Sequence, residues 1–187
     1  MSQKLPLSPG RAREVAEELL GTSPRRWAHV QAVGLQAARV AQALPEDDRE
    51  LFAVTAWLHD IGYAEPLVDT GFHSLDGAAW LRAQGHERVA GLVAHHSCAS
   101  FEAELRGLSG LMDSYPDEAT PVRDLLTYCD MTTGPAGQSI TLAARLNDVE
   151  ARYGPEAIVT RALRRAEPEL RRQYRAAEAL IGVSQPM

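Results

Sequence analysis

The sequence predicts an all-α fold, and three observations favour this class. Apolar residues recur at intervals of three and four along nearly the whole chain, which is the spacing of an amphipathic helix. Ser-Pro pairs, acidic residues and glycines stand at the borders of these stretches, where helices begin and end. No stretch shows the sustained alternation of apolar and polar residues that a strand requires. We therefore expect one domain over residues 1–187, with about eight or nine helices.

The predicted helices follow from this spacing and its borders. Ser-Pro pairs at residues 8–9 and 23–24 begin the first two helices, and Gly62 stops the third. The helices of the first half are expected at residues 9–20, 24–44, 47–59, 74–84 and 86–96, with a loop at 63–73. Residues 97–117 contain glycines and a proline, which predict a loop with one short helix. Helical spacing resumes at residues 118–131, 140–153 and 159–181, and Pro168 should kink or restart the last of these helices.

The composition argues against some classes of partner. The formal net charge is −6, with 25 acidic and 19 basic residues, which disfavours a broad surface for nucleic acid or for an anionic membrane. The N-terminal residues lack the apolar core of a signal peptide, and the apolar stretch Leu51–Leu58 is too short to span a bilayer. Two cysteines, Cys98 and Cys129, are too few for a disulfide framework. We therefore expect a cytoplasmic protein that binds neither nucleic acid nor membrane, and a homo-oligomer stays open.

The segment AWLHDIGYAEP, residues 56–66, places a histidine and an aspartate side by side at the end of an apolar helix. Polar groups at such a place need partners. One candidate is His29, which lies at the angular position of Val33 and Val40 at about 100° per residue, and which should therefore face inward. Another is Asp130, at the end of a later helix. Taken singly, a buried histidine or an acid at a helix end is more often structural than functional.

Together, the four side chains favour a metal site. The two imidazoles and two carboxylates of His29, His59, Asp60 and Asp130 form a mixed nitrogen and oxygen set, which suits Mn, Fe, Ni, Zn or Mg. A divalent ion would also offset the charges of the buried carboxylates. Adjacent residues on a helix diverge by about 100°, so His59 and Asp60 can share one ion only where the helix ends. Alternatively, Asp60 bridges two ions. We expect one or two divalent ions per chain.

These residues resemble the HD-domain superfamily of metal-dependent phosphohydrolases. The order His29, His59-Asp60 and Asp130 is similar to the pattern of the superfamily, and LHDIG resembles its HDIG subgroup. The resemblance covers roughly residues 23–135 as a metal-binding core, while the helices at 138–182 carry no motif. It implies an all-α helical domain with the metal site between helices, and the four residues named as metal ligands.

The resemblance also implies a second metal in some members. The candidate ligands for it are His73, His95 and His96, with Asp60 bridging the two ions. The helical angle lets only one of the adjacent pair point straight at the site, and the resemblance favours His95. The expected catalytic residues are Asp60, and His73 or His96 as the group that protonates the leaving oxygen.

The activity that the resemblance implies is hydrolysis of a phosphomonoester or phosphodiester, in a nucleotide or another small phosphorylated metabolite. The metal would lower the pKa of water and polarise the phosphoryl oxygen. Two alternatives stay open. One is a di-iron oxygenase of the same superfamily, and the other is a metal- and nucleotide-binding sensor without activity.

The expected contacts with the substrate are Arg26, Tyr63, Thr132 and Thr133. A surface arginine and a turn that ends a helix are the structural interpretations of Arg26 and of the two threonines. Tyr63 stands where many HDIG members have a lysine that can touch a phosphate. The extended GYP signature of cyclic-dinucleotide phosphodiesterases is absent, which lowers the case for such a substrate.

Overall fold

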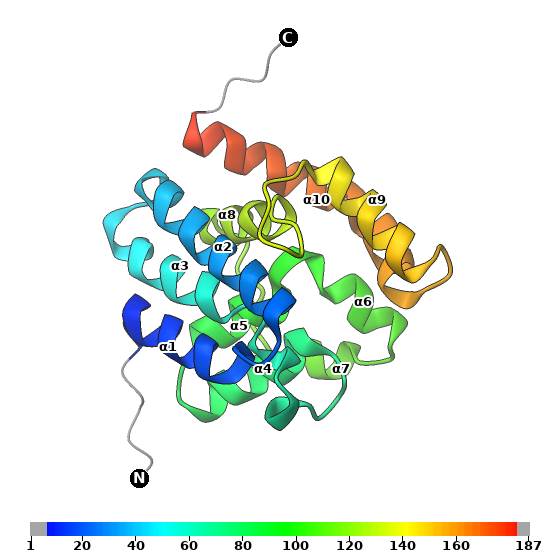
Figure 1. Ribbon diagram of the computed structural model, residues 1–187, viewed down its shortest axis with the longest axis horizontal. Coiled ribbons are helices and arrows are strands. Elements are labelled where there is room, and N and C mark those ends of the chain that lie inside the picture. The colour runs from blue at the N-terminus through cyan, green and yellow to red at the C-terminus, as the bar shows by residue number, and fades with distance from the viewer. Residues whose placement is uncertain (1–6, 183–187) are drawn as a thin grey trace.

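A computed structural model describes residues 7–182 of the chain, so residues 1–6 and 183–187 of the predicted domain lie outside the described part. Ten α-helices and no strand are present between residues 7 and 182, which confirms the all-α class. The α-helices are α1 (Pro9–Leu20), α2 (Pro24–Val40), α3 (Glu46–Leu58), α4 (His73–Ala83), α5 (Glu87–His95), α6 (Ser100–Leu105), α7 (Ser109–Met112), α8 (Pro121–Met131), α9 (Leu142–Tyr153) and α10 (Ile158–Ile181) (Figure 1). Short 3-10 turns follow α2, α3 and α5, among them η2 (Ile61–Tyr63) and η4 (His96–Cys98).

The helix borders agree with the sequence signals except at two places. The Oγ of Ser8 accepts a hydrogen bond from Arg11 N, as an N-cap should. Residues 97–117 hold two short helices rather than the expected one. The last helix runs without a break through Pro168. Pro168 has no amide hydrogen to donate to the carbonyl of Arg164. Both residues lie on the exposed face of the helix, where water can bond to that carbonyl.

The core is arranged around α3. One apolar cluster joins α1, α3, α4 and α5, and a second joins α2, α3 and α8. The ring of Trp57, which belongs to the first cluster, lies against Gly34 so closely that a Cβ there would be 2.5 Å from it. A glycine at this position therefore lets α2 approach α3, and this approach brings His29 toward the end of α3.

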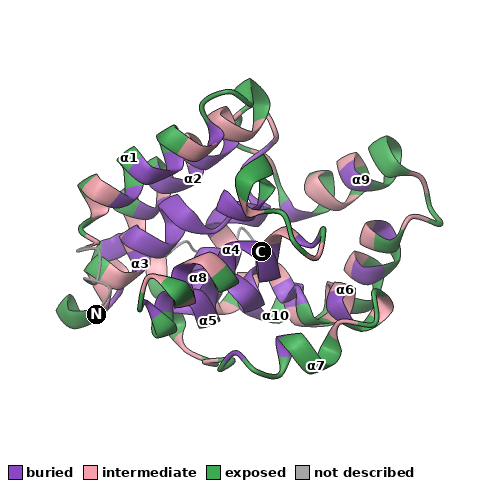
Figure 2. Cartoon of the chain, turned by 90° about the horizontal axis from the view of Figure 1, so that it is seen from below, coloured by how far each residue is buried: buried purple, intermediate pink, exposed green. Residues whose placement is uncertain are grey.

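The periphery of the molecule is formed by the later helices. Figure 2 shows the buried residues gathered in α2, α3, α5 and α8, whereas α9 and α7 are mostly exposed or intermediate. Helix α10 packs on α6 and α8, and α9 packs on α10. Only Leu142 and Val149 of α9 are buried. Within residues 7–182, no helix is both long enough and apolar enough to cross a membrane.

Gly62 fixes the distance between η2 and the start of α4. A Cβ at this position would lie 2.0 Å from the carbonyl oxygen of His73 and 2.5 Å from the amide of Gly77. Both atoms belong to the backbone, so only a shift of the turn or of α4 could make room. The turn follows Asp60 and the helix begins at His73, so Gly62 sets the spacing between these two side chains.

We expect Gly62→Ala to lower the free energy of unfolding by about 1–3 kcal/mol or more, because the added methyl group overpacks two backbone segments. The measurement is denaturant unfolding followed by circular dichroism. Gly110→Ala is the matched control: a Cβ there meets open space, and alanine should leave stability unchanged or slightly higher. Equal stability of the Gly62→Ala variant and the wild type would show that η2 and α4 are not held in contact.

Candidate metal centre

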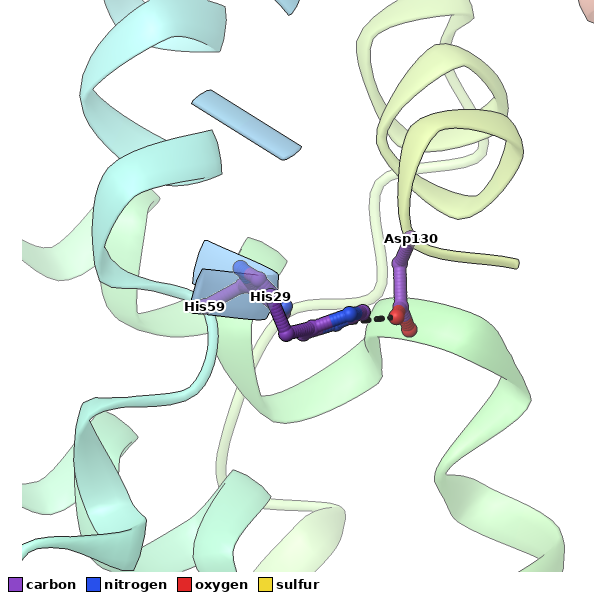
Figure 3. A group of neighbouring side chains, drawn as sticks. All are labelled: His29, His59 and Asp130. Atoms are coloured by element: carbon purple, nitrogen blue, oxygen red, sulfur yellow. Dashed lines mark hydrogen bonds and ion pairs between the residues drawn. The ribbon is translucent and has the colours of Figure 1, made fainter. Parts of the chain in front are cut away.

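Six of the predicted site residues meet where five helices converge. His29 lies within α2 and Asp130 in the last turn of α8. His59 and Asp60 follow α3, His73 is the first residue of α4, and His96 follows α5. Five of the six are buried, and the side chain of His73 is 18% exposed. Figure 3 shows His29, His59 and Asp130 pointing toward one another from α2, the end of α3 and α8.

Three of the histidines are oriented by the same kind of hydrogen bond. The Nδ1 of His29 donates to Gly134 O at 3.2 Å, that of His59 to Ala56 O at 2.9 Å, and that of His96 to Val93 O at 2.6 Å. A carbonyl oxygen only accepts, so the proton of each ring is on Nδ1. The lone pair of each Nε2 then faces the centre, which is the arrangement that metal-binding histidines have.

Two of these carbonyls are available because the helices end there. His59 and His96 stand directly after the last residues of α3 and α5, and each bonds the carbonyl three residues before it. The last four carbonyls of a helix have no partner within the helix. The histidine side chains supply that partner, so the same hydrogen bond satisfies a carbonyl at the helix end and orients the imidazole toward the site.

The Nε2 atom of His59 lacks a partner among the side chains of the site. His59 is fully buried, and its Nε2 makes no hydrogen bond. The nearest carboxylate oxygen, Asp60 Oδ2, lies 3.5 Å away. A buried nitrogen with a free lone pair is costly unless it has a partner, and a divalent cation is a partner of the required kind.

Asp60 divides its two oxygens between two groups of side chains. Its Oδ2 lies 3.8 Å from His29 Nε2 and 3.5 Å from His59 Nε2. Its Oδ1 lies 3.4 Å from His73 Nε2 and 3.8 Å from His96 Nε2. Burial opposes ionisation, but Arg26 and then His59 hold the pKa of Asp60 well below its usual range. The carboxylate is therefore charged and faces both groups at once.

Two sets of potential ligand atoms result. His29, His59 and Asp130 form one set and Asp60, His73 and His96 the other, and the atoms within each set lie within 4.8 Å of one another. Imidazole nitrogen and carboxylate oxygen together suit a borderline or hard divalent ion. The residues therefore fit a divalent metal, with Asp60 placed between the two sets.

The carboxylate of Asp130 has several partners around it. Its Oδ1 lies 3.0 Å from His29 Nε2 (Figure 3), and a proton or a cation must lie between these atoms because both otherwise present lone pairs. Its Oδ2 accepts a hydrogen bond from the hydroxyl of Ser97. Burial raises the pKa of Asp130, but the contact with His29 outweighs it and the pKa falls below its usual range.

Ser97 reaches Asp130 by way of an unusual backbone. Its φ and ψ are 50° and 36°, in the left-handed region that residues other than glycine seldom occupy. Cys98 follows with a φ of 60°. This reversal turns the chain sharply after His96, where the hydroxyl of Ser97 meets Asp130, while His96 itself points at Asp60. Strained backbone of this kind is common at functional sites.

The second set contains His96 and not His95, contrary to the preference stated from the sequence. The Nε2 of His95 donates to Tyr115 O at 2.9 Å, and its Nδ1 lies 4.0 Å from Asp117 Oδ2. His95 is the last residue of α5, and the backbone leaves the helical geometry at His95 (φ −100°, ψ 3°) and His96 (φ −59°, ψ 147°), where the side chain of His96 enters the site. Helical angles alone could not locate this change of direction.

The rings of His73 and His96 are in the form that binds metals. Burial lowers the pKa of His73 to about 3, and burial followed by the charge of His59 lowers the pKa of His96. Both imidazoles are therefore neutral at neutral pH. A group that protonates a leaving oxygen must carry its proton beforehand, so these environments favour the ligand role over the expected role as acid.

Arg26, Tyr63 and His73 form a stack at the mouth of the site. The guanidinium of Arg26 lies 3.7 Å from the centre of the Tyr63 ring and donates a hydrogen bond to Asp60 Oδ2. On its other face the Tyr63 ring lies 4.1 Å from that of His73, at an interplanar angle of 13°. Within residues 7–182 His73 Nδ1 has no hydrogen bond to a carbonyl like those of the other three histidines, and the ring of Tyr63 packs on His73 instead.

Thr132 and Thr133 lie outside the cavity at this site. The hydroxyl of Thr132 donates to Tyr128 O at 2.7 Å, and that of Thr133 contacts Cys129 O at 2.8 Å. Both also contact the side-chain amide of Gln36. The structure therefore places the two threonines in the role of ending α8, the interpretation that competed with substrate contact.

A cavity of about 290 Å³ opens onto His29, Asp60, His73, His96 and Asp130. Arg26 and Tyr63 line it, as expected for contacts with a substrate, and 46% of the Tyr63 surface is exposed. Arg145 of α9 and Ser97 also line it, although neither belongs to a sequence motif. The one signal for Arg145 is its spacing from Val149 and Arg152, which puts all three on one face of α9.

We expect Tyr63→Ala to weaken binding of the second metal ion by about 10- to 100-fold, because His73 loses the ring that orients it. Tyr63→Phe is the matched control, since it keeps the ring and should keep the affinity. The measurement is calorimetric titration of metal-free protein with Mn²⁺, together with elemental analysis of metal per chain. Unchanged affinity of Tyr63→Ala for two ions would show that the stack does not hold His73.

Comparison with known proteins agrees with this geometry. The family model of the HD domain matches residues 26–149, more than half of the chain, and this range contains all six residues at the centre. It also extends through most of α9. No curated protein and no solved structure gives a significant match. The chain therefore belongs to the HD domain superfamily, whose members are mostly metal-dependent phosphohydrolases.

Proposed function

We propose that this protein is a metal-dependent phosphohydrolase that acts on a phosphomonoester or phosphodiester of a nucleotide or another small metabolite. The observation that supports it best is the carboxylate of Asp60, which faces His29 and His59 with one oxygen and His73 and His96 with the other. A shared carboxylate is the arrangement with which two-metal hydrolases hold adjacent ions. The LHDIG sequence supports assignment to the HDIG-type subgroup.

The side chains of this site would have two roles, holding the metal ions and positioning the ligands. His29, His59 and Asp130 would hold one divalent ion, and His73 and His96 a second, with Asp60 common to both. When bound, a divalent metal lowers the pKa of water and polarises a phosphoryl oxygen. Arg26 and Ser97 keep the two carboxylates in position through their hydrogen bonds.

The buried setting also excludes competing water. Five of the six ligand residues are buried, and the cavity reaches them from one side, past Arg26 and Tyr63. Electrostatic interactions are stronger in such a site than in open water. We also propose a cytoplasmic location, which is supported by Cys98 and Cys129, both buried and unpaired.

We expect Asp60→Asn to lose most of its metal and to retain less than about 1% of wild-type turnover, because a neutral amide cannot balance the charge of two ions. Elemental analysis of the purified variant gives the metal content, and a panel of phosphomonoesters and phosphodiesters gives the turnover. Asp113→Asn is the control, since Asp113 is exposed and outside the cavity. Full metal content in Asp60→Asn would remove Asp60 from the ligand set.

The same panel separates the proposal from its alternatives. A phosphohydrolase releases phosphate or a phosphomonoester at the same rate with and without O₂, because hydrolysis consumes only water. Turnover that requires O₂ and iron would instead identify a di-iron oxygenase. Binding of metal and nucleotide without turnover of any compound would identify a sensor.

A further inference from the structure

The guanidinium of Arg145 is a largely buried charge whose Nε has no hydrogen-bond partner among the described residues. Its side chain is 12% exposed, and its Nε is buried without a hydrogen-bond partner. The nearest carboxylate oxygen, Asp130 Oδ1, lies 3.8 Å from Nη2, which is beyond hydrogen-bonding distance. An arginine remains charged at any working pH, and its ion pair with Asp130 is longer than a hydrogen bond, so this buried guanidinium has donors left for a further anion.

The place of Arg145 indicates where that partner would lie. Arg145 lines the same cavity as His29, Asp60, His73, His96 and Asp130, and it reaches the cavity from α9, a helix that supplies none of them. Asp130 belongs to the set of side chains that fits a metal, so its charge is shared with His29. An anionic oxygen held between the metal ligands and Arg145 would satisfy the guanidinium.

The neighbouring Arg152 shows that an unsatisfied arginine is not general on this helix. Arg152 lies on the same face of α9, two turns later, and its Nη2 forms an ion pair of 2.7 Å with Asp148. Arg145 has no such partner on its own helix. This difference between the two arginines is consistent with an Arg145 guanidinium whose donors are available to a ligand.

Apolar side chains, together with Arg152, line the wall beside Arg145. Val149, one turn further along α9, is 5% exposed and lines the cavity together with Tyr153, Val159 and Leu163. An apolar wall next to a free guanidinium fits a ligand with an anionic group joined to an apolar or aromatic group. Inorganic phosphate or a polyphosphate would leave this wall in contact with water.

We propose that Arg145 binds the phosphoryl group of the substrate and that the wall of α9 around Val149 binds the organic group of the same ester. The inference rests on the proposed function and adds the substrate class, an organic phosphoester with an apolar or aromatic group close to the phosphorus. Arg145 is then a catalytic residue in the sense that it touches the phosphoryl oxygens, with a planar fork suited to two of them.

The test uses the full chain loaded with Mn²⁺ and inorganic phosphate as the probe, followed by calorimetry. In Arg145→Gln we expect unchanged metal content and a phosphate affinity lower by about 10- to 100-fold, since charged hydrogen bonds to the anion are lost. Arg145→Lys keeps the positive charge without the planar fork of donors, so its phosphate affinity should lie between those of the wild type and Arg145→Gln. Arg161→Gln, an exposed arginine of α10 outside the cavity, makes the same charge change and should match the wild type.

Each alternative outcome overturns the inference. Loss of metal together with phosphate in Arg145→Gln and Arg145→Lys would show that Arg145 only supports Asp130. Equal phosphate affinity in wild type and both variants, or no phosphate binding by the wild type, would show that Arg145 does not meet the anion.

The organic group is tested with methylphosphonate and phenylphosphonate, which carry the same anionic head. The apolar wall predicts that phenylphosphonate binds at least about fivefold more tightly, because it buries more apolar surface. Equal affinities would remove the wall from the proposal.

Failure of this inference is distinguishable from failure of the proposed function. A wild type that hydrolyses phosphoesters while Arg145→Gln keeps full phosphate affinity would leave the function and overturn the inference. A wild type that binds phosphate through Arg145 but hydrolyses no phosphoester would support the anion site and overturn the function.

Discussion

The sharing of one buried carboxylate between two sets of imidazoles is the interaction on which the arrangement of the site depends. Asp60 follows α3, the helix around which the core clusters are built, and its two oxygens face side chains from α2, α4 and the end of α5. Without a charge at this point, Asp130 would be the remaining carboxylate beside these histidines in the described part of the chain. The ion pair with Arg26 fixes the carboxylate from the open side. The packing of four helices and the chemistry of the site therefore meet at a single residue.

Hydrogen bonds at the helix ends orient two of the imidazole rings in this arrangement. His59 and His96 each bond a carbonyl that the helix itself cannot satisfy, and this bond fixes both the tautomer and the direction of the ring. His29 lies inside a helix, where the carbonyls are taken, and it bonds Gly134 in the turn after α8 instead. His73, at a helix start, relies on the face of Tyr63. The same requirement, a ring held from behind, is met by three different local solutions.

These local solutions also explain what the sequence could and could not predict. The inward position of His29 follows from its place on the apolar face of a regular helix, and regular helices obey a fixed angle per residue. The choice between His95 and His96 depends on the end of α5, where the backbone of His95 and His96 departs from helical geometry, and the spacing of apolar residues does not show that departure. Arg145 carries no motif, because its importance arises from what α9 lies beside rather than from its neighbours in the chain.

Helix α9 buries only Leu142 and Val149, although it forms one wall of the cavity. A helix that buries so few residues can change its sequence, its length or its angle while the candidate metal ligands on α2, α4 and α8 and after α3 and α5 keep their positions. Selection for a new substrate and selection for a stable fold then act on different parts of the chain. Proteins that share this centre could diverge in specificity by altering one peripheral helix, with few of the compensating changes that a redesigned core demands.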